Sequence, residues 1–579
     1  MRLIAATCLL SLLACALAEA RTRERMPLRV GPDTQPVVVL PVDAPPITHY
    51  AAQELVHHIA LATDITLRIA DATEALPAGQ PRIVLGEGLA REAGIVLDGL
   101  PPEVCVLRTM GRDLYIAART GPGNPLSESN VYGAVLWGVY EVLERDLGVR
   151  WLWPGKLGTH VPRAESVALS VYDEAIQPRF AQRRLRPSLG PRGFAVADAR
   201  LAFSPAERQR YAQAQTVWLR RHRMGRRAHT YFSEPKYGSG HAFYGWWERY
   251  GDEHPEWFNL RPDGGRGPAD PDRPHRFSMC VTNEALQRRI VALWAEARAV
   301  NPGQPLSLGI GENDYRAACV CEACRAWDGP DAEPETLPPG LERSYEPVEA
   351  GTRYARFAQR MLARARAIDP DVRLHFYAYS NYFWAPRPTV ELDPNVVIGF
   401  VPWFRWAGWF PRRDDTHAWI KQQWQGWQDT GASVYYRPNW FLDGYTMPHV
   451  YMQQFADAFR FYAQHGMHAT DFDSLQGMWA TQGPNLYLLA RLHVRPDATA
   501  GELLDEYYAA FGPAADAVRD YFGYWEQYSK DNRAAAADAI RTRHDGHFRR
   551  YAHYARVADE LYPPEVFAQG FARLDTAAA

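Results

Sequence analysis

The chain has 579 residues, of which 47% are hydrophobic and 23% charged, and its formal net charge is -3 at pH 7. This length exceeds what one hydrophobic core supports, and the composition is that of a soluble globular protein. The near-neutral charge gives no reason to expect a nucleic-acid partner. Only four of the 64 Lys and Arg residues are lysines, at positions 156, 236, 421 and 530, which argues against Schiff-base chemistry.

Export is predicted by the first twenty residues. Arg2 precedes an apolar run over residues 3–18 that is too short for a membrane span and is typical of a secretory signal peptide, residues 1–20. AEA at 18–20 resembles a signal peptidase site, whereas LLAC at 12–15 resembles an imperfect lipoprotein box. No later segment has the apolar length of a transmembrane helix. We therefore expect a periplasmic or extracellular protein that is soluble or carries a lipid anchor.

Residues 27–170 are predicted to form a separate α+β domain. Its apolar, strand-like runs are residues 37–40, 82–86, 104–107 and 114–118. The last two runs flank a short polar turn and predict a hairpin. Apolar residues recur at the helical period around residues 52–59 and again around 135–143, which predicts two helices.

From residue 178 to 490, strand-like runs alternate with amphipathic helical patterns such as those at 286–297 and 354–368. The eight predicted strands are residues 180–185, 227–232, 277–281, 306–310, 374–379, 396–401, 434–436 and 469–472. Such alternation implies parallel pairing through right-handed crossovers, and eight units close into a (β/α)8 TIM-like barrel. Residues 496–575 are predicted to form a helical C-terminal region.

Acidic residues follow two of these strands. Glu312 and Asp314 follow the fourth strand, and their side chains would share a face if the strand continued. The carboxyl ends of barrel strands surround the active site, and paired carboxyl groups hydrolyse glycosidic bonds. Glu312 is the predicted acid and Asp314 its partner, although a salt bridge and a loop cap would also explain them. Asp471 and Asp473, at the end of the eighth strand, are candidates for the second carboxylate or are loop initiators.

Aromatic, amide and guanidinium groups follow the fifth, sixth and seventh strands. Flat aromatic faces stack on the apolar faces of sugar rings, so these groups would suit a sugar-binding wall. The predicted substrate-binding residues are Tyr379, Asn381, Trp403, Arg405, Asn439 and Trp440.

A C-x-C-x-x-C motif, Cys319, Cys321 and Cys324, follows the predicted acid. Export favours a disulfide with one leftover thiol. The alternative is a structural zinc site in which Cys280 supplies the fourth thiolate. We expect no catalytic cofactor, and either arrangement would brace the loop of the predicted acid.

Several short motifs resemble the bacterial family built on the domain of unknown function 4838, part of which is classed as glycoside hydrolase family 163. These motifs are HPEWF at 254–258, MCVTN at 279–283, Asn313-Asp314 before the cysteine motif, and Tyr507-Tyr508 before FGPAA at 511–515. The resemblance covers roughly residues 170 to 525. YEVL at 140–143 and LGVRWLWPG at 147–155 are similar to the accessory domain that precedes β-hexosaminidase and α-glucuronidase barrels.

The resemblance implies a secreted glycoside hydrolase of the β-N-acetylglucosaminidase type that acts on glycans. In the related hexosaminidases an Asp-Glu pair after the fourth strand works with the acetamido group of the substrate: the Glu protonates and the Asp orients the amide. The order Glu312-Asn313-Asp314 departs from that pair. Two alternatives stay open: an α-glucuronidase-like hydrolase that binds an acidic sugar through Arg405 or Arg437, and a non-catalytic carbohydrate-binding surface protein.

Overall fold

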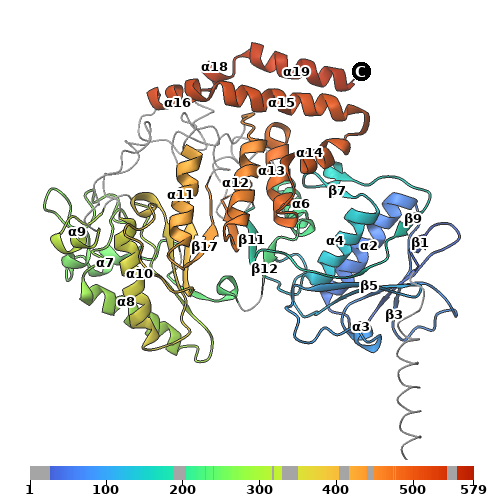
Figure 1. Ribbon diagram of the computed structural model, residues 1–579, viewed down its shortest axis with the longest axis horizontal. Coiled ribbons are helices and arrows are strands. Elements are labelled where there is room, and N and C mark those ends of the chain that lie inside the picture. The colour runs from blue at the N-terminus through green and yellow to red at the C-terminus, as the bar shows by residue number, and fades with distance from the viewer. Residues whose placement is uncertain are drawn as a thin grey trace, which may run out of the picture. The chain divides into compact units, whose positions relative to one another are not determined.

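The computed structural model describes residues 26–187, 204–227, 230–238, 240–315, 318–328, 350–402, 416–439, 447–473, 475, 478–543 and 557–578. The chain divides into two compact units, residues 1–178 and 179–579. In Figure 1 the first is drawn from blue to cyan and the second from green to red. Within the described ranges, no helix combines the length and the apolar character needed to cross a membrane.

The first unit is built on a six-stranded mixed sheet with the order β10-β5-β6-β4-β2-β3. Its strands are β2 (Val37–Leu40), β3 (Ile69–Asp71), β4 (Arg82–Leu85), β5 (Cys105–Met110), β6 (Asp113–Ala118) and β10 (Asp173–Ile176). Two small sheets pair β1 (Leu28–Val30) with β9 (Val167–Leu169) and β7 (Arg150–Trp151) with β8 (Thr159–His160). The predicted strands and the predicted hairpin, β5 with β6, are confirmed.

Helix α4 (Ala134–Asp146) packs against β5 and β6, and α2 (Pro46–Thr63) packs against α4, as Figure 1 shows; α3 (Gly88–Glu92) and the 3-10 helix η1 (Lys156–Gly158) are shorter. Gly138 permits the close contact between α4 and the sheet, because a Cβ there would lie 2.5 Å from Cys105 Sγ and 2.6 Å from Ile116 Cγ2. Both long helices agree with the predicted helical patterns.

The second unit contains an eight-stranded sheet with the order β12-β11-β18-β17-β16-β15-β14-β13. Its strands are β11 (Gln182–Leu185), β12 (Gly225–Arg226), β13 (Lys236–Tyr237), β14 (Ser307–Gly309), β15 (Leu374–Ala378), β16 (Val396–Phe400), β17 (Ser433–Tyr436) and β18 (Ala469–Phe472). Every neighbouring pair is parallel except β11 with β12. Six of the eight predicted strands are therefore confirmed.

The other two predicted strands are wrong. At the end of the second predicted strand, residues 227–232, the chain forms the 3-10 helix η2 (Tyr231–Ser233) instead. The strand that joins the sheet after it is β13. Residues 277–281, the third prediction, contribute only one isolated bridge, between Met279 and Phe258. These apolar residues are buried, but they are buried against loops and not in a strand ladder.

The sheet curls, because residues from opposite ends of its strand order approach one another. Burial lowers the pKa of Lys236 on β13 to about 8, and the positive charges of Arg226 on β12 and Arg184 on β11 add to this lowering. Arg226 also donates from Nη1 to the carbonyl oxygen of Phe232 in η2, at 2.5 Å. The described residues include no hydrogen-bonded pair between β12 and β13, so closure into a complete (β/α)8 barrel stays a prediction.

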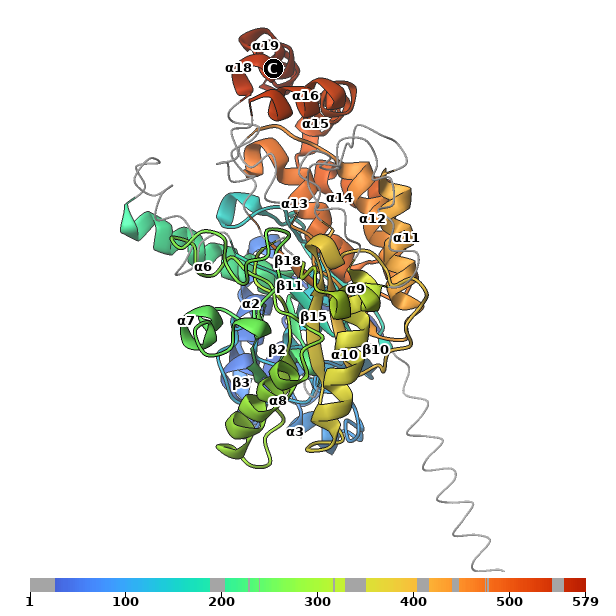
Figure 2. The same ribbon diagram turned by 90° about the vertical axis from the view of Figure 1, so that its left-hand side faces the viewer.

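The helices of this part of the chain are, in order, α6 (Pro205–Arg221), α7 (Trp246–Tyr250), α8 (Glu284–Ala299), α9 (Glu322–Asp328), α10 (Gly351–Arg366), α11 (Thr416–Gln428), α12 (Met452–Gln464) and α13 (Trp479–Val494), with the 3-10 helices η3 (Pro255–Trp257) and η4 (Ser380–Tyr382). Of these, α10 and α11 pack against strands of the curled sheet. Figure 2 shows α10 beside β15 and α9 beside α10. Aromatic residues form much of the contact: Phe376 packs on Trp427 of α11, and Tyr436 on Tyr462 of α12.

The described residues after 496 are mainly helical. They form α14 (Ala500–Ala509), the 3-10 helix η6 (Gly512–Ala514), α15 (Ala515–Asp531), α16 (Arg533–Thr542), α18 (Ala558–Leu561) and α19 (Pro564–Ala578). Figures 1 and 2 both show α15 and α19 side by side. A capping box between Thr499 and Glu502 starts α14, since it satisfies backbone N–H groups that the helix leaves unpaired. These helices belong to the second compact unit, and a separate C-terminal domain stays a prediction.

Gly399 on β16 leaves the space that two inner-face tyrosines occupy. A Cβ at this position would lie 2.6 Å from Cδ1 of Tyr377 and 2.7 Å from the hydroxyl of Tyr435. We expect Gly399→Ala to lower the free energy of unfolding by about 1–3 kcal/mol through overpacking, as measured by urea denaturation.

The matched control is Gly523→Ala in α15, where nothing lies within 4 Å of an added Cβ. Because alanine favours a helix over glycine, this variant should gain up to about 1 kcal/mol. A neutral or stabilising Gly399→Ala would show that the two tyrosines are not packed against the strand backbone.

Candidate functional site at the carboxyl edge of the sheet

Side-chain alternation decides which residues enter the inside of the curled sheet. Tyr377 and Tyr435 pack inward in one apolar cluster, whereas their neighbours Phe376 and Tyr436 pack on helices. The register pairs Arg184 with Asp471, and backbone hydrogen bonds continue one residue beyond β11, β17 and β18. Eight positions at the carboxyl edge then share the inner face: Arg184, Arg186, Tyr377, Tyr379, Arg437, Asn439, Asp471 and Asp473. Together with Asp314 they form what we call the carboxyl-edge site.

Asp471 is held as a carboxylate by Arg186. Nε of Arg186 donates to Oδ1 at 2.9 Å and Nη2 donates to Oδ2 at 2.7 Å. Burial by itself would raise the pKa of Asp471, but the charge and hydrogen bonds of Arg186, with Arg437 and Arg184 contributing, hold it below its usual value. Asp471 therefore does not fit the role of a proton donor near neutral pH, and an anchoring role suits its geometry.

Asp473 lies between two guanidinium groups. Its Oδ2 is 3.4 Å from Nη1 of Arg186 and 3.5 Å from Nη2 of Arg437. Arg437 also donates from Nη1 to Oδ1 of Asn439 at 2.6 Å, and its guanidinium carbon lies 5.0 Å from the centre of the Tyr377 ring. Arg437 thus contacts two residues that were predicted for the site, Asp473 and Asn439. The sequence suggested Arg437 itself only for the alternative function, the binding of an acidic sugar.

Asp314 is exposed, on the loop after β14, and accepts a hydrogen bond from the Tyr379 hydroxyl at 2.9 Å. Tyr379 follows β15, the strand next to β14. The structure therefore joins two residues that were predicted for different roles, an acid and a sugar-binding aromatic residue.

The Glu312 carboxyl group is buried against α10. Glu312 lies on the loop after β14, which ends at Gly309. The Glu312 carboxylate is 1% exposed; Oε1 accepts from the hydroxyl of Tyr354 on α10 at 2.6 Å, and Met279 N–H donates to both oxygens at 3.1 and 3.2 Å. The contacts of Glu312 are thus with α10 and the loop before α8, and joint action of Glu312 and Asp314 stays a prediction.

Burial raises the pKa of Glu312 to about 7, against the opposing hydrogen bonds from Tyr354 and Met279. The backbone of Glu312 is held as well, because Nδ1 of His241 lies 2.7 Å from its carbonyl oxygen. Glu312 thus ties β14 to α10 and to the loop before α8.

The four cysteines converge from two segments. All four Sγ atoms, of Cys280, Cys319, Cys321 and Cys324, lie within 4.8 Å of one another, and none forms a disulfide in the structure. This finding departs from the favoured expectation of a disulfide with one leftover thiol.

Three predicted sugar-binding residues, Trp403, Arg405 and Trp440, lie outside the described residues, as does the side chain of Asn381. The residues that sequence reasoning missed at the carboxyl edge are Arg184, Arg186 and Tyr377. The sequence did contain a pattern that could have identified them. Each lies two residues along the chain from another polar or aromatic residue, and this spacing is typical of side chains on one face of a strand.

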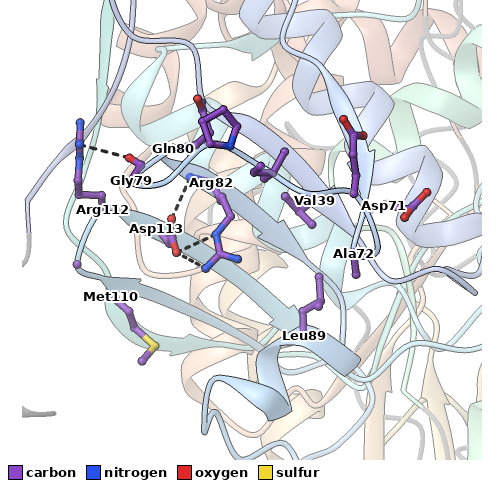
Figure 3. A pocket seen from close by; sticks show the side chains of 14 residues that line it. Val39, Asp71, Ala72, Gly79, Gln80, Arg82, Leu89, Met110, Arg112 and Asp113 are labelled. Atoms are coloured by element: carbon purple, nitrogen blue, oxygen red, sulfur yellow. Dashed lines mark hydrogen bonds and ion pairs between the residues drawn. The ribbon is translucent and has the colours of Figure 1, made fainter.

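A pocket of about 620 Å3 lies in the first unit, beside β2, β4 and the β5–β6 turn (Figure 3). Arg82 and Asp113, which line it, are paired with each other through Nη2 and Oδ2 at 2.6 Å. Its two central charges thus satisfy each other, and we assign no chemistry to this pocket.

The fold and site define a mixed α/β protein with polar groups gathered at the carboxyl edge of a curled, mainly parallel sheet. The chain belongs to the family of the domain of unknown function DUF4838, whose model matches residues 153–523. This match confirms the family resemblance inferred from the short motifs. No curated protein matches the chain.

Among solved structures, the chain resembles a family GH115 4-O-methyl-α-glucuronidase with specificity for decorated arabinogalactans, at 12% identity and a TM-score of 0.47 over 94% of this chain and 69% of that one. It also resembles the Streptomyces plicatus N-acetyl-β-hexosaminidase, at 14% identity and a TM-score of 0.36 over 85% and 92%. A family 20 β-N-acetylglucosaminidase is 13% identical, with a TM-score of 0.35 over 84% of this chain and 92% of that one. Identities and TM-scores this low assign no activity to the chain.

The Arg186–Asp471 pair should stabilise the second unit. Asp471→Asn would leave the Arg186 charge without its main partner; we expect it to lower the free energy of unfolding at pH 7 by about 3 kcal/mol, as measured in urea. Because the folded pKa lies below the unfolded one, this stabilisation is present above about pH 4 and is lost as pH falls through the folded pKa. The difference between variant and wild type should therefore shrink at pH 3.

The control is Asp497→Asn, which removes an exposed pair with Arg179 and should cost at most about 1 kcal/mol. If both variants lose the same small amount at pH 7, the Arg186–Asp471 pair contributes no more than a surface contact.

Proposed function

We propose that the chain is a glycoside hydrolase that acts on glycans, with the carboxyl-edge site as its active site. The observation that carries this proposal is the placement of carboxyl groups from two strands, Asp314 after β14 and Asp473 after β18, at the same edge of a curled parallel sheet. Ligands of parallel α/β sheets bind outside the carboxyl ends of the strands, where loops bring together side chains that are distant in sequence.

The chemistry needs a proton donor for the leaving oxygen and a second carboxyl group that acts as nucleophile, base or orienting group. We place Asp314 in the first role by its position, because it is exposed at the carboxyl edge and the Tyr379 hydroxyl orients its carboxyl group. Asp473 suits the second, since Arg186 and Arg437 position it from two sides. Asp471 is the buried anchor that orients Arg186.

For the substrate, we propose a glycan with N-acetylglucosamine at the cleaved bond, as the family resemblance implies. The acetamido group of such a sugar needs hydrogen-bonding partners, and Asp314 with the Tyr379 hydroxyl can offer both an acceptor and a donor. We further propose that residues 1–20 export the chain, because an enzyme that acts on large glycans must reach them outside the cell.

The second candidate is a hydrolase of acidic sugars. It is favoured by the three guanidinium groups gathered at the carboxyl edge, those of Arg184, Arg186 and Arg437. A guanidinium group binds a carboxylate through two parallel hydrogen bonds, so one of these arginines could bind a carboxylate of the substrate.

Substitutions at the site separate these roles. We expect Asp314→Asn and Asp473→Asn each to lower kcat by roughly 10²- to 10⁴-fold, the usual contribution of a catalytic acid or base. Glu312→Gln should retain most of the kcat, because glutamine can still accept the hydrogen bonds from Met279 and Tyr354. Melting temperatures of all three variants show whether a loss of kcat reflects chemistry or unfolding.

A loss of kcat in Glu312→Gln as large as that in Asp314→Asn, at an unchanged melting temperature, would contradict this assignment and make Glu312 the acid. Full activity in both aspartate variants would move the chemistry away from the carboxyl edge.

A substrate panel tests the proposed class. We expect release of sugar from N-glycans or chitooligosaccharides and none from glucuronoxylan, as followed by chromatography of the products. Turnover of glucuronoxylan alone would favour the acidic-sugar hydrolase. Binding of glycans without turnover of any of them would indicate a carbohydrate-binding protein.

A further inference from the structure

The four clustered cysteines are unexplained by the proposed hydrolysis. Cys319 and Cys321 precede α9 and Cys324 lies in it, while Cys280 lies on a separate loop before α8. Three of the four are at most 5% exposed, and Cys321 is half-buried. Since 38 residues separate Cys280 from Cys319, the fold and not local sequence brings their sulfur atoms together.

We propose that Cys280, Cys319, Cys321 and Cys324 bind one structural zinc ion. Four thiolates at about 2.3 Å from a tetrahedral zinc ion lie about 3.8 Å from one another. Sγ of Cys280 is 3.7 Å from Sγ of Cys321 and 3.8 Å from Sγ of Cys324, and no two of the four sulfur atoms are more than 4.8 Å apart. The sulfur atoms thus have the spacing of a single tetrahedral site.

Pairing into disulfides fits this arrangement less well. Cys280 is equally close to Cys321 and Cys324, so the geometry selects neither as its partner. The remaining cysteines are two or five residues apart, and a disulfide between them would close a very small loop with little entropic benefit. An iron–sulfur cluster is also disfavoured, because bridging sulfides would hold the four cysteine sulfurs farther apart than a single ion does.

The surroundings donate hydrogen bonds to the sulfur atoms, as expected around metal-bound thiolates. The backbone N–H of Leu260 donates to Sγ of Cys319 at 3.2 Å, and the Thr282 hydroxyl lies 3.2 Å from Sγ of Cys324. Arg353, which is ion-paired with Asp328, donates from Nη1 to the carbonyl oxygen of Cys319 at 2.9 Å and so holds the backbone beside the site. Binding releases the thiol protons: one Zn2+ and four thiols give a four-thiolate complex of charge -2 and four protons.

The zinc ion would join the loop before α8 to the loop after β14. Met279, next to Cys280, donates its backbone N–H to Glu312, and Asp314 lies five residues before Cys319. The metal and the buried Glu312 carboxylate would then both link the loop before α8 to the loop after β14. Both links would restrain the backbone near Asp314.

Metal analysis of the untagged chain, purified without added chelator, tests the proposal. We expect about one zinc per chain, loss of zinc in Cys280→Ser and Cys324→Ser, and one zinc retained in Cys105→Ser. Cys105 is the matched control, a buried cysteine of the first unit that lies outside the cluster. Removal of zinc by a chelator should lower the melting temperature of the wild type, and addition of zinc should restore it.

Two measurements on the wild type keep the test independent of whether the variants fold. Replacement of zinc by Co2+ should give the intense visible absorption and the sulfur-to-cobalt charge-transfer band of a tetrahedral four-thiolate site. Alkylation in denaturant with chelator, but without reductant, should label all four cysteines. A disulfide between any two of them without bound metal, iron in place of zinc, or four free thiols that take up no zinc would each overturn the proposal.

Discussion

The second unit depends on one constraint: along each parallel strand, successive side chains alternate between the inside of the curled sheet and the helices outside it. The inner set is polar and aromatic, with Tyr377, Arg437 and Asp471 at the carboxyl edge, while Phe376, Tyr436 and Phe472 pack on helices. Because the side-chain period is two, a shift of one residue would exchange these sets and bury unpaired charge among aromatic rings. The site and the core are therefore specified together.

Buried charge is tolerated inside the sheet because each charged group has a partner. Arg186 binds Asp471 through two hydrogen bonds and approaches Asp473, which Arg437 also approaches. Removing Asp471 or Arg186 would break the two-hydrogen-bond pair and leave a charge without its main partner, which is why this pair is costly to interrupt. On the loop after β14, the buried Glu312 carboxylate accepts hydrogen bonds from Tyr354 and Met279, and so links this loop to α10 and to the loop before α8.

How far the sequence could predict the fold depends on the type of strand. β16 is apolar over all five residues and was recognised because burial on both faces produces a continuous apolar run. β13 is only Lys236–Tyr237, and its polar start carries no such signal. Residues 277–281 carry the signal without forming a strand of the sheet, since Phe277 and Met279 fill a loop core. Burial and strand pairing are separate properties, and composition reports only the first.

The sequence by itself determined which residues carry chemistry and their spacing: acids two residues apart after two strands, three cysteines in one short motif, and a family membership legible in a few motifs. Only the tertiary structure decided which way these groups face. Glu312 is buried and accepts a hydrogen bond from Tyr354 of α10, whereas Asp314 is exposed and accepts one from Tyr379 after the next strand. Likewise, the three cysteines of the motif met their fourth member, Cys280, only through the fold. The physical reason is the same in both cases, because a side chain's partner is set by register and by segment packing, which are properties of the whole chain.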